Sequence, residues 1–182
     1  MKILYAPEVT ILNNKQTLFL AGPIRCTRNW QQQLIDLFNQ DTNKYPNLVI
    51  ANPHRREGVV PLKDFQYEMF DEQIKWEMKH LADAADHGVI SYFLANQLER
   101  DPFQSYARTT RFELGEWFGE LKNRNDIKIV IGWEKQFPGL KYIVQRIKFL
   151  CAINKNKKNQ IKFCEEEGLD CFKTNIINML NT

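Results

Sequence analysis

Glu77 is the first residue whose position suggests chemistry, because it interrupts an apolar pattern. Helical spacing places it at one step of a stripe whose other members are Phe70, Ile74, Leu81 and Ala84. A carboxylate on an apolar face is unfavourable unless it is paired or hydrogen-bonded. We therefore expect Glu77 either to lie at the edge of the stripe beside a partner such as an arginine, or to have a raised pKa suited to acid–base work.

Glu113 lies in residues 108–116 (RTTRFELGE), which allow two explanations. Thr110 and Glu113 have the spacing of a capping box, in which the glutamate bonds back to the threonine amide. A helix that begins here would also offer free backbone amides to an anion. The apolar stripe beside Glu113 would fix the carboxylate on a packed element, and its members are Leu114, Trp117, Phe118 and Leu121.

Two carboxylates on separate helices that face one crevice would suit cleavage of a glycosidic bond. One carboxylate attacks the anomeric carbon or stabilises its positive charge, and the other handles the proton of the leaving group. A separation of about 5 Å would favour a covalent glycosyl-enzyme with retention of configuration.

Polar residues follow two apolar runs that we predict to be strands. Gly22, Pro23 and Arg25 follow the run at 17–22, where the glycine permits a close backbone approach and the arginine could face an anion or a sugar hydroxyl. A simple strand-to-helix turn would explain this segment equally well. It contains no GxGxxG fingerprint, so a dinucleotide site is not supported.

The second polar group follows the run at 48–51. Asn52 could bind the edge of a base or a sugar hydroxyl, and Arg55 and Arg56 could bind phosphate, pair with carboxylates or be solvated. His54 has no serine or cysteine nucleophile motif beside it.

Short apolar runs alternate with longer helical patterns, which predicts an α/β fold. We expect strands at 17–22, 48–51, 88–94, 127–132 and 160–164, and helices near 29–40, 67–85, 110–122, 140–152 and 168–180. This rhythm predicts one domain over 1–182, a small doubly wound, mostly parallel five-stranded sheet in flavodoxin-like order 2-1-3-4-5. The first dozen residues could add an edge strand. Ligands of such sheets bind at the carboxyl ends of the strands, where the order reverses.

Composition excludes several classes of protein. A net charge of +3 is too balanced to indicate a nucleic-acid partner, and the basic run at 155–158 is expected to be a solvated loop. No apolar run could span a membrane, and no secretory signal is visible. The four cysteines show neither a CxxC pair nor zinc-like spacing, so we expect reduced thiols, no metal and a cytoplasmic location.

Five short segments together resemble the nucleoside 2-deoxyribosyltransferase family, especially the branch with an LAGPI opening. They are 19–25 (FLAGPIR), 52–56 (NPHRR), 73–77 (QIKWE), 85–86 (AD) and 112–115 (FELG). They occur in the family's order and cover roughly residues 17–135, whereas the last third of the chain matches poorly.

The resemblance implies a double displacement without metal or cofactor. Glu113 matches the nucleophile that attacks C1′ of a 2′-deoxynucleoside, and Glu77 matches the acidic residue that binds the base and moves its proton. A second base then takes the sugar. Sites of this family often borrow residues from a neighbouring subunit, so the resemblance also implies a homo-oligomer.

The chain departs from the family pattern in ways that leave a second reaction open. The transferases carry a tyrosine near the end of the first strand that touches the nucleophile, and the nearest match here is Phe19. Related nucleotide hydrolases hold a 5′-phosphate with residues that match Arg25 and Thr110, and Arg111 is a further candidate. Base exchange is therefore our first hypothesis. Hydrolysis of a (deoxy)nucleoside 5′-monophosphate and a nucleotide-binding module without turnover are the alternatives.

Overall fold

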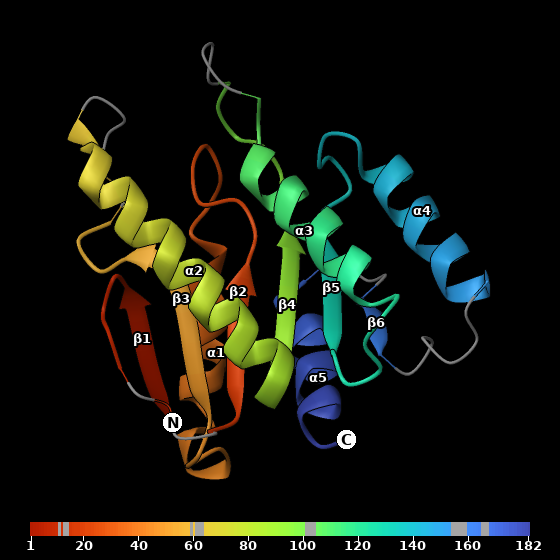
Figure 1. The fold of residues 1–182 in the computed structure, drawn as a ribbon, viewed down its shortest axis with the longest axis horizontal. Helices are drawn as coiled ribbons and strands as arrows, with labels where there is room; N and C mark the ends of the chain where they lie inside the picture. The colour runs from red at the N-terminus through yellow and green to blue at the C-terminus, as the bar shows by residue number, and fades with distance from the viewer. Residues whose placement is uncertain are drawn as a thin grey trace.

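A parallel sheet with helices on both faces organises the chain in the computed structural model (Figure 1). The structure describes residues 1–10, 12, 15–58, 60, 64–100, 105–153, 160–164 and 168–182. The basic run at 155–158 lies outside these residues.

Six strands of the described chain form the sheet, in the order β1-β3-β2-β4-β5-β6 with every neighbouring pair parallel. Their bounds are β1 Lys2–Ala6, β2 Thr17–Ala21, β3 Val49–Arg55, β4 Gly88–Leu94, β5 Ile129–Trp133 and β6 Ile161–Cys164. The doubly wound α/β class is confirmed. The count of five strands was one too low, because the first residues add β1 beside β3; the other five strands have the predicted 2-1-3-4-5 order.

The helices follow their strands as the sequence predicts. Their bounds are α1 Trp30–Asn39, α2 Tyr67–His87, α3 Arg108–Glu120, α4 Leu140–Ile153 and α5 Leu169–Leu180, with a short 3-10 turn at Thr42–Lys44. The Asn29 side chain caps α1 by accepting a hydrogen bond from the backbone amide of Gln32. The helix bounds differ from the predicted ones by at most two residues at each end.

Two apolar layers fix the helices to the sheet. One layer packs α2, α3 and α4 against one face, and the other packs α1 and α5 against the opposite face (Figure 1). β2 is buried along its whole length, as its unbroken apolar sequence TLFLA predicts for a central parallel strand. Both chain ends lie at the edge where the strands begin, which leaves the carboxyl ends of the strands open for a ligand.

The apolar stripe predicted on α2 is only half correct. Leu81 and Ala84 are buried against the sheet, but Phe70 and Ile74 are 49% and 37% exposed. The first half of α2 extends past the carboxyl ends of the strands, so the sheet gives these two side chains nothing to pack against (Figure 1).

Candidate active site

A cavity of about 210 Å³ opens at the carboxyl ends of β2 and β3, between α2 and the start of α3. Chain connections diverge there, since β2 is flanked by β3 on one side and β4 on the other. Ligands of doubly wound sheets bind at this kind of crossover. Glu77 and Glu113 both line the cavity, together with five more of the residues singled out from sequence, namely Gly22, Pro23, Arg25, Arg55 and Thr110.

Gly22 follows the last residue of β2 and brings the backbone close to its neighbours. A Cβ atom there would lie 2.5 Å from the Phe93 carbonyl oxygen and 2.6 Å from the Trp30 ring. Its φ of +153° also lies in the region that favours glycine. Only glycine therefore fits the turn that forms this wall of the cavity.

Glu77 extends from the middle of α2 and is held by one neighbour on the same helix. The Gln73 side-chain amide donates to the Glu77 carboxylate and to the Pro53 carbonyl oxygen, each over 2.8 Å. Burial raises the pKa of Glu77 to about 7, while the hydrogen bond from Gln73 and the charge of Arg55 act in the opposite direction. Glu77 therefore changes protonation close to neutral pH, as a general acid and base requires.

Glu113 lies in the second turn of α3 and faces the same cavity. Burial raises its pKa to about 8, and the negative charges of Glu77 and Glu116 contribute in the same direction. Because Glu77 and Glu113 interact, they titrate as a pair rather than separately. Around neutral pH the pair retains a proton, so one group can act as a base or nucleophile while the other acts as an acid.

The capping box predicted for Thr110 and Glu113 is wrong. α3 begins at Arg108, and Ala107 occupies the cap position with no side-chain hydrogen bond. Ala107 adopts a left-handed conformation (φ +54°), which starts the helix before Thr110 is reached. Thr110 is instead a buried residue of the first turn that lines the cavity, and the Glu113 carboxylate is free of a capping role.

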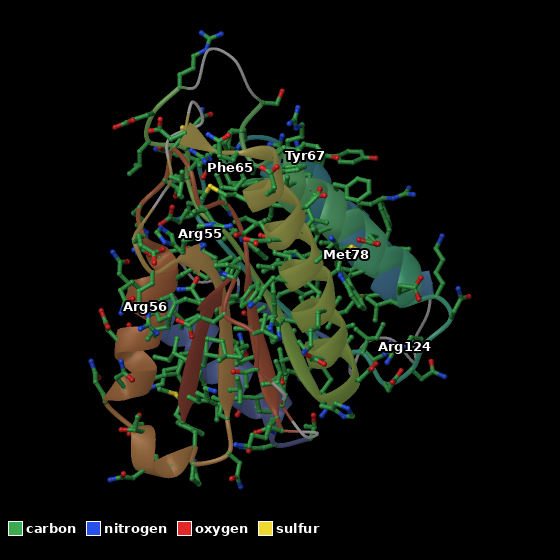
Figure 2. The ribbon with its side chains drawn as sticks, turned by 60° about the vertical axis from the view of Figure 1, so that its left-hand side comes forward. Arg55, Arg56, Phe65, Tyr67, Met78 and Arg124 are labelled. Carbon is green, nitrogen blue, oxygen red and sulfur yellow. The ribbon has the colours of Figure 1, made fainter. Side chains whose placement is uncertain are left out.

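Cationic side chains surround an aromatic ring at the other wall. The guanidinium groups of Arg25 and Arg55 lie 5.9 and 5.6 Å from the centre of the Phe65 ring. Figure 2 shows Arg55 and Phe65 close together near the start of α2. Arg25 donates to the Val60 carbonyl oxygen over 2.6 Å, and Arg55 donates to the Met69 carbonyl oxygen in the first turn of α2 over 3.0 Å.

Three residues singled out from sequence do not line this cavity. The buried Asn52 side chain accepts a hydrogen bond from the His54 amide, which holds the end of β3. Arg56 pairs with Glu8 over 2.7 Å and lies apart from Arg55 in Figure 2. Arg111 donates to the Pro138 carbonyl oxygen and lines a separate groove between α3 and α4.

Sequence reasoning did not select several residues that line the cavity, among them Gln73, Phe65, Tyr106 and Arg108. Gln73 had a readable signal, because it lies one helical turn before Glu77 and shares its face. Phe65 and Tyr106 lie in connecting segments without periodicity, where no pattern indicates which way a side chain points.

A family model described as nucleoside 2-deoxyribosyltransferase like matches residues 15–128, well over half of the chain. The chain belongs to this nucleoside 2-deoxyribosyltransferase-like family. A search of curated proteins finds no significant match. The family match runs from the lead into β2 to the end of the loop before β5, and it includes both carboxylates and the turn at Gly22. Family membership supports a nucleoside substrate and glycosyl-transfer or hydrolytic chemistry.

The structure adds two observations about binding partners. Within the described parts of the chain, no cluster of three or more histidine, cysteine, aspartate or glutamate residues has an arrangement that could hold a metal ion. Nor does any helix among those residues have the length and apolar character needed to cross a membrane.

Proposed function

We propose that the protein cleaves the N-glycosidic bond of a 2′-deoxynucleoside and transfers the sugar to another base. The observation that carries this proposal is the pair of partly buried carboxyl groups, Glu77 and Glu113, that line one cavity with raised pKa values. Groups with perturbed pKa values in a cleft are typical of acid–base and nucleophilic sites.

The reaction proceeds in two displacements. The Glu113 carboxylate attacks C1′, the bond between C1′ and the base nitrogen breaks, and its electron pair leaves with the base while Glu77 supplies a proton. The second base then attacks C1′ of the glycosyl ester, Glu113 leaves as a carboxylate, and Glu77 takes the proton of the incoming base. Two inversions give net retention at C1′.

The cavity also favours a second reaction, hydrolysis of a nucleoside 5′-monophosphate. Arg25, Arg55 and Arg108 all line it, and guanidinium groups bind phosphate well. Thr110 offers a hydroxyl on the first turn of α3, beside free helix amides. In this reaction water takes the place of the second base, and Glu77 accepts its proton.

Chromatography distinguishes these reactions. The protein is incubated with 2′-deoxynucleosides and their 5′-monophosphates, each with and without an acceptor base. A new nucleoside that forms only with acceptor supports transfer, whereas free base from monophosphates without acceptor supports hydrolysis. Thermal stabilisation by ligands without released base would overturn both and leave a binding module.

The nucleophile has its own test. Acid-quenched wild-type protein, mixed with substrate but no acceptor, should show a covalent deoxyribosyl adduct by intact mass, located on the peptide that contains Glu113. Glu113→Gln should show neither adduct nor turnover. An adduct on another residue would refute the assignment.

We also propose that the domain, residues 1–182, forms a homo-oligomer through α2. Four apolar side chains are exposed along this helix and recur at spacings of three or four residues, namely Tyr67, Phe70, Ile74 and Met78. Figure 2 shows Tyr67 and Met78 on the outer side of α2. Ile74 and Met78 directly follow Gln73 and Glu77 in the sequence of α2, so the exposed apolar side of the helix adjoins the side that lines the cavity. A second copy docked on the apolar side would therefore border the cavity.

Light scattering tests the oligomer. Met78→Glu should lower the molar mass in solution, because a charge in an apolar interface is unfavourable. Phe149→Glu is the matched control, since Phe149 is an exposed apolar side chain on α4. A monomeric wild type, or dissociation by the control alone, would contradict the proposal.

A further inference from the structure

The side chain of Tyr92 lies wholly inside the protein with an unsatisfied hydroxyl. The residue is 0% exposed, and its hydroxyl has no hydrogen-bond partner among the residues that the structure describes. A buried tyrosine hydroxyl usually finds a partner, because an unpaired polar group in the interior is destabilising. The position of Tyr92 therefore calls for an explanation.

The strand register places Tyr92 directly behind the proposed site. Tyr92 pairs with Ala21, the last residue of β2 and part of the cavity wall. Its side chain belongs to the apolar layer under α3, which includes Leu114, the residue after Glu113. Burial raises the pKa of Tyr92 most, and the charges of Glu113 and then Glu116 raise it further, so both carboxylates act on this hydroxyl.

Glu113, in contrast to Tyr92, is a possible acceptor that lacks a hydrogen-bond donor among the described residues. Burial and two nearby negative charges disfavour its ionised form, and among the described residues no hydrogen bond to its carboxylate acts against them. Glu77, by contrast, has Gln73 as a donor. The described residues thus present a buried donor without a partner in the apolar layer under α3 and, on that helix, a partly buried carboxylate that lacks a donor. An ionised carboxylate accepts a hydroxyl hydrogen bond more strongly than a neutral group does.

We propose that Tyr92 is a positioning residue whose hydroxyl donates a hydrogen bond to the ionised Glu113 carboxylate and holds it for attack on C1′. This inference rests on the function proposed above and adds a residue to it. The hydrogen bond forms when Glu113 loses its proton, so it favours the nucleophilic state. Three other charged groups influence the ionisation of the two carboxyl groups. Glu77 on α2 and Glu116 on α3 raise the pKa of Glu113, and Arg55 at the end of β3 lowers the pKa of Glu77.

Tyr92→Phe tests the proposal directly. Loss of a hydrogen bond to a charged group should lower kcat about 10- to 100-fold, with KM changed by about twofold or less, since the bond forms on the enzyme rather than with substrate. The acidic limb of the pH–rate profile should move to higher pH. At pH 5, where Glu113 is protonated, the variant should melt no lower than the wild type, because the Tyr92 hydroxyl then has no partner to lose.

Tyr5→Phe is the matched control. Tyr5 donates its hydroxyl to Gln32 over 3.3 Å and does not line the cavity, so its loss should leave the pH–rate profile in place. A second measurement introduces 3,5-difluorotyrosine at position 92, which keeps the shape and makes the hydroxyl a stronger donor. It should move the acidic limb to lower pH, opposite to phenylalanine.

The outcomes separate the two proposals. An active wild type with an unchanged profile in both position-92 variants would overturn the role of Tyr92 and leave the proposed function intact. An inactive wild type would overturn the proposed function itself. If Tyr92→Phe failed to fold, the fluorinated protein alone would decide, through the direction in which its acidic limb moves.

Discussion

Replacement of Glu113 by glutamine should stabilise the protein while removing its activity. In the folded chain the pKa of Glu113 is raised from 4.5 to about 8, chiefly by burial and then by Glu77 and Glu116. Between these two pH values the folded state binds more protons than the unfolded state. The free energy of unfolding therefore falls as pH rises through this window, and glutamine, which has no proton to lose, does not incur this loss.

The size of the effect follows from the shift. Each pKa unit corresponds to about 1.4 kcal/mol, so the full shift from 4.5 to about 8 gives an upper limit of about 5 kcal/mol above pH 8. Glu113 keeps some contact with solvent and titrates together with Glu77. We therefore expect Glu113→Gln to raise the free energy of unfolding by about 1–3 kcal/mol at pH 8, and by less than about 0.5 kcal/mol at pH 4.5.

Urea unfolding of wild type and variant at several pH values between 4.5 and 8 measures this difference. Glu120→Gln is the matched control, because Glu120 is exposed on the same helix, and it should change stability by less than about 0.5 kcal/mol at every pH. A gain in the free energy of unfolding that did not depend on pH, or a less stable Glu113→Gln protein, would refute the assignment of a partly buried carboxyl with a raised pKa at this position.

Three further outcomes follow from the same geometry. The pH dependence of kcat/KM should be bell-shaped with limbs near 7 and 8, values that belong to the coupled Glu77–Glu113 pair and not to either residue alone, since activity needs one proton on the pair. A flat profile from pH 6 to 9 would contradict this. Gly22→Ala should lower the melting temperature and abolish turnover, because its Cβ would lie 2.6 Å from the Trp30 ring, and a fully active variant would exclude this tight turn. Gly119→Ala, in a helix with open space around it, should instead stabilise by about 0.5–1 kcal/mol in thermal unfolding, and a loss of stability would show that this position is covered.

The fold was predictable because its central strands are buried on both faces. Thr17–Ala21 and Gly88–Leu94 are short, largely apolar runs, and the longer helical segments between them require parallel crossovers. The edge strand Lys2–Ala6 gave a weaker signal, because it is only partly buried and its register with β3 shifts after Tyr5. Its place in the sheet depends on pairing with β3, which local sequence does not specify.

The site was predictable to the extent that strand ends and helix faces determine it. Both carboxylates reach one cavity because the carboxyl ends of parallel strands lie at one edge of the sheet. The capping box failed because the conformation of a single residue, Ala107, starts α3 early. Arg55 and Arg56 are adjacent and chemically equal, yet only Arg55 lines the cavity while Arg56 pairs with Glu8. Tertiary contacts beyond the strand decide that difference.

The pH dependence of the rate cannot by itself identify the acceptor, because the Glu77–Glu113 pair gives up and regains one proton in either reaction. In transfer, the departing base takes a proton from Glu77 and the incoming base returns one. In hydrolysis, water returns that proton instead, so both reactions pass through the same protonation states and share their limbs near 7 and 8. The reactions differ only in what attacks the glycosyl ester. Adding an acceptor base at fixed pH should therefore raise the rate of base release from a deoxynucleoside if transfer is the reaction and breakdown of the ester limits turnover. If the same acceptor leaves that rate unchanged and forms no new nucleoside, water is the acceptor.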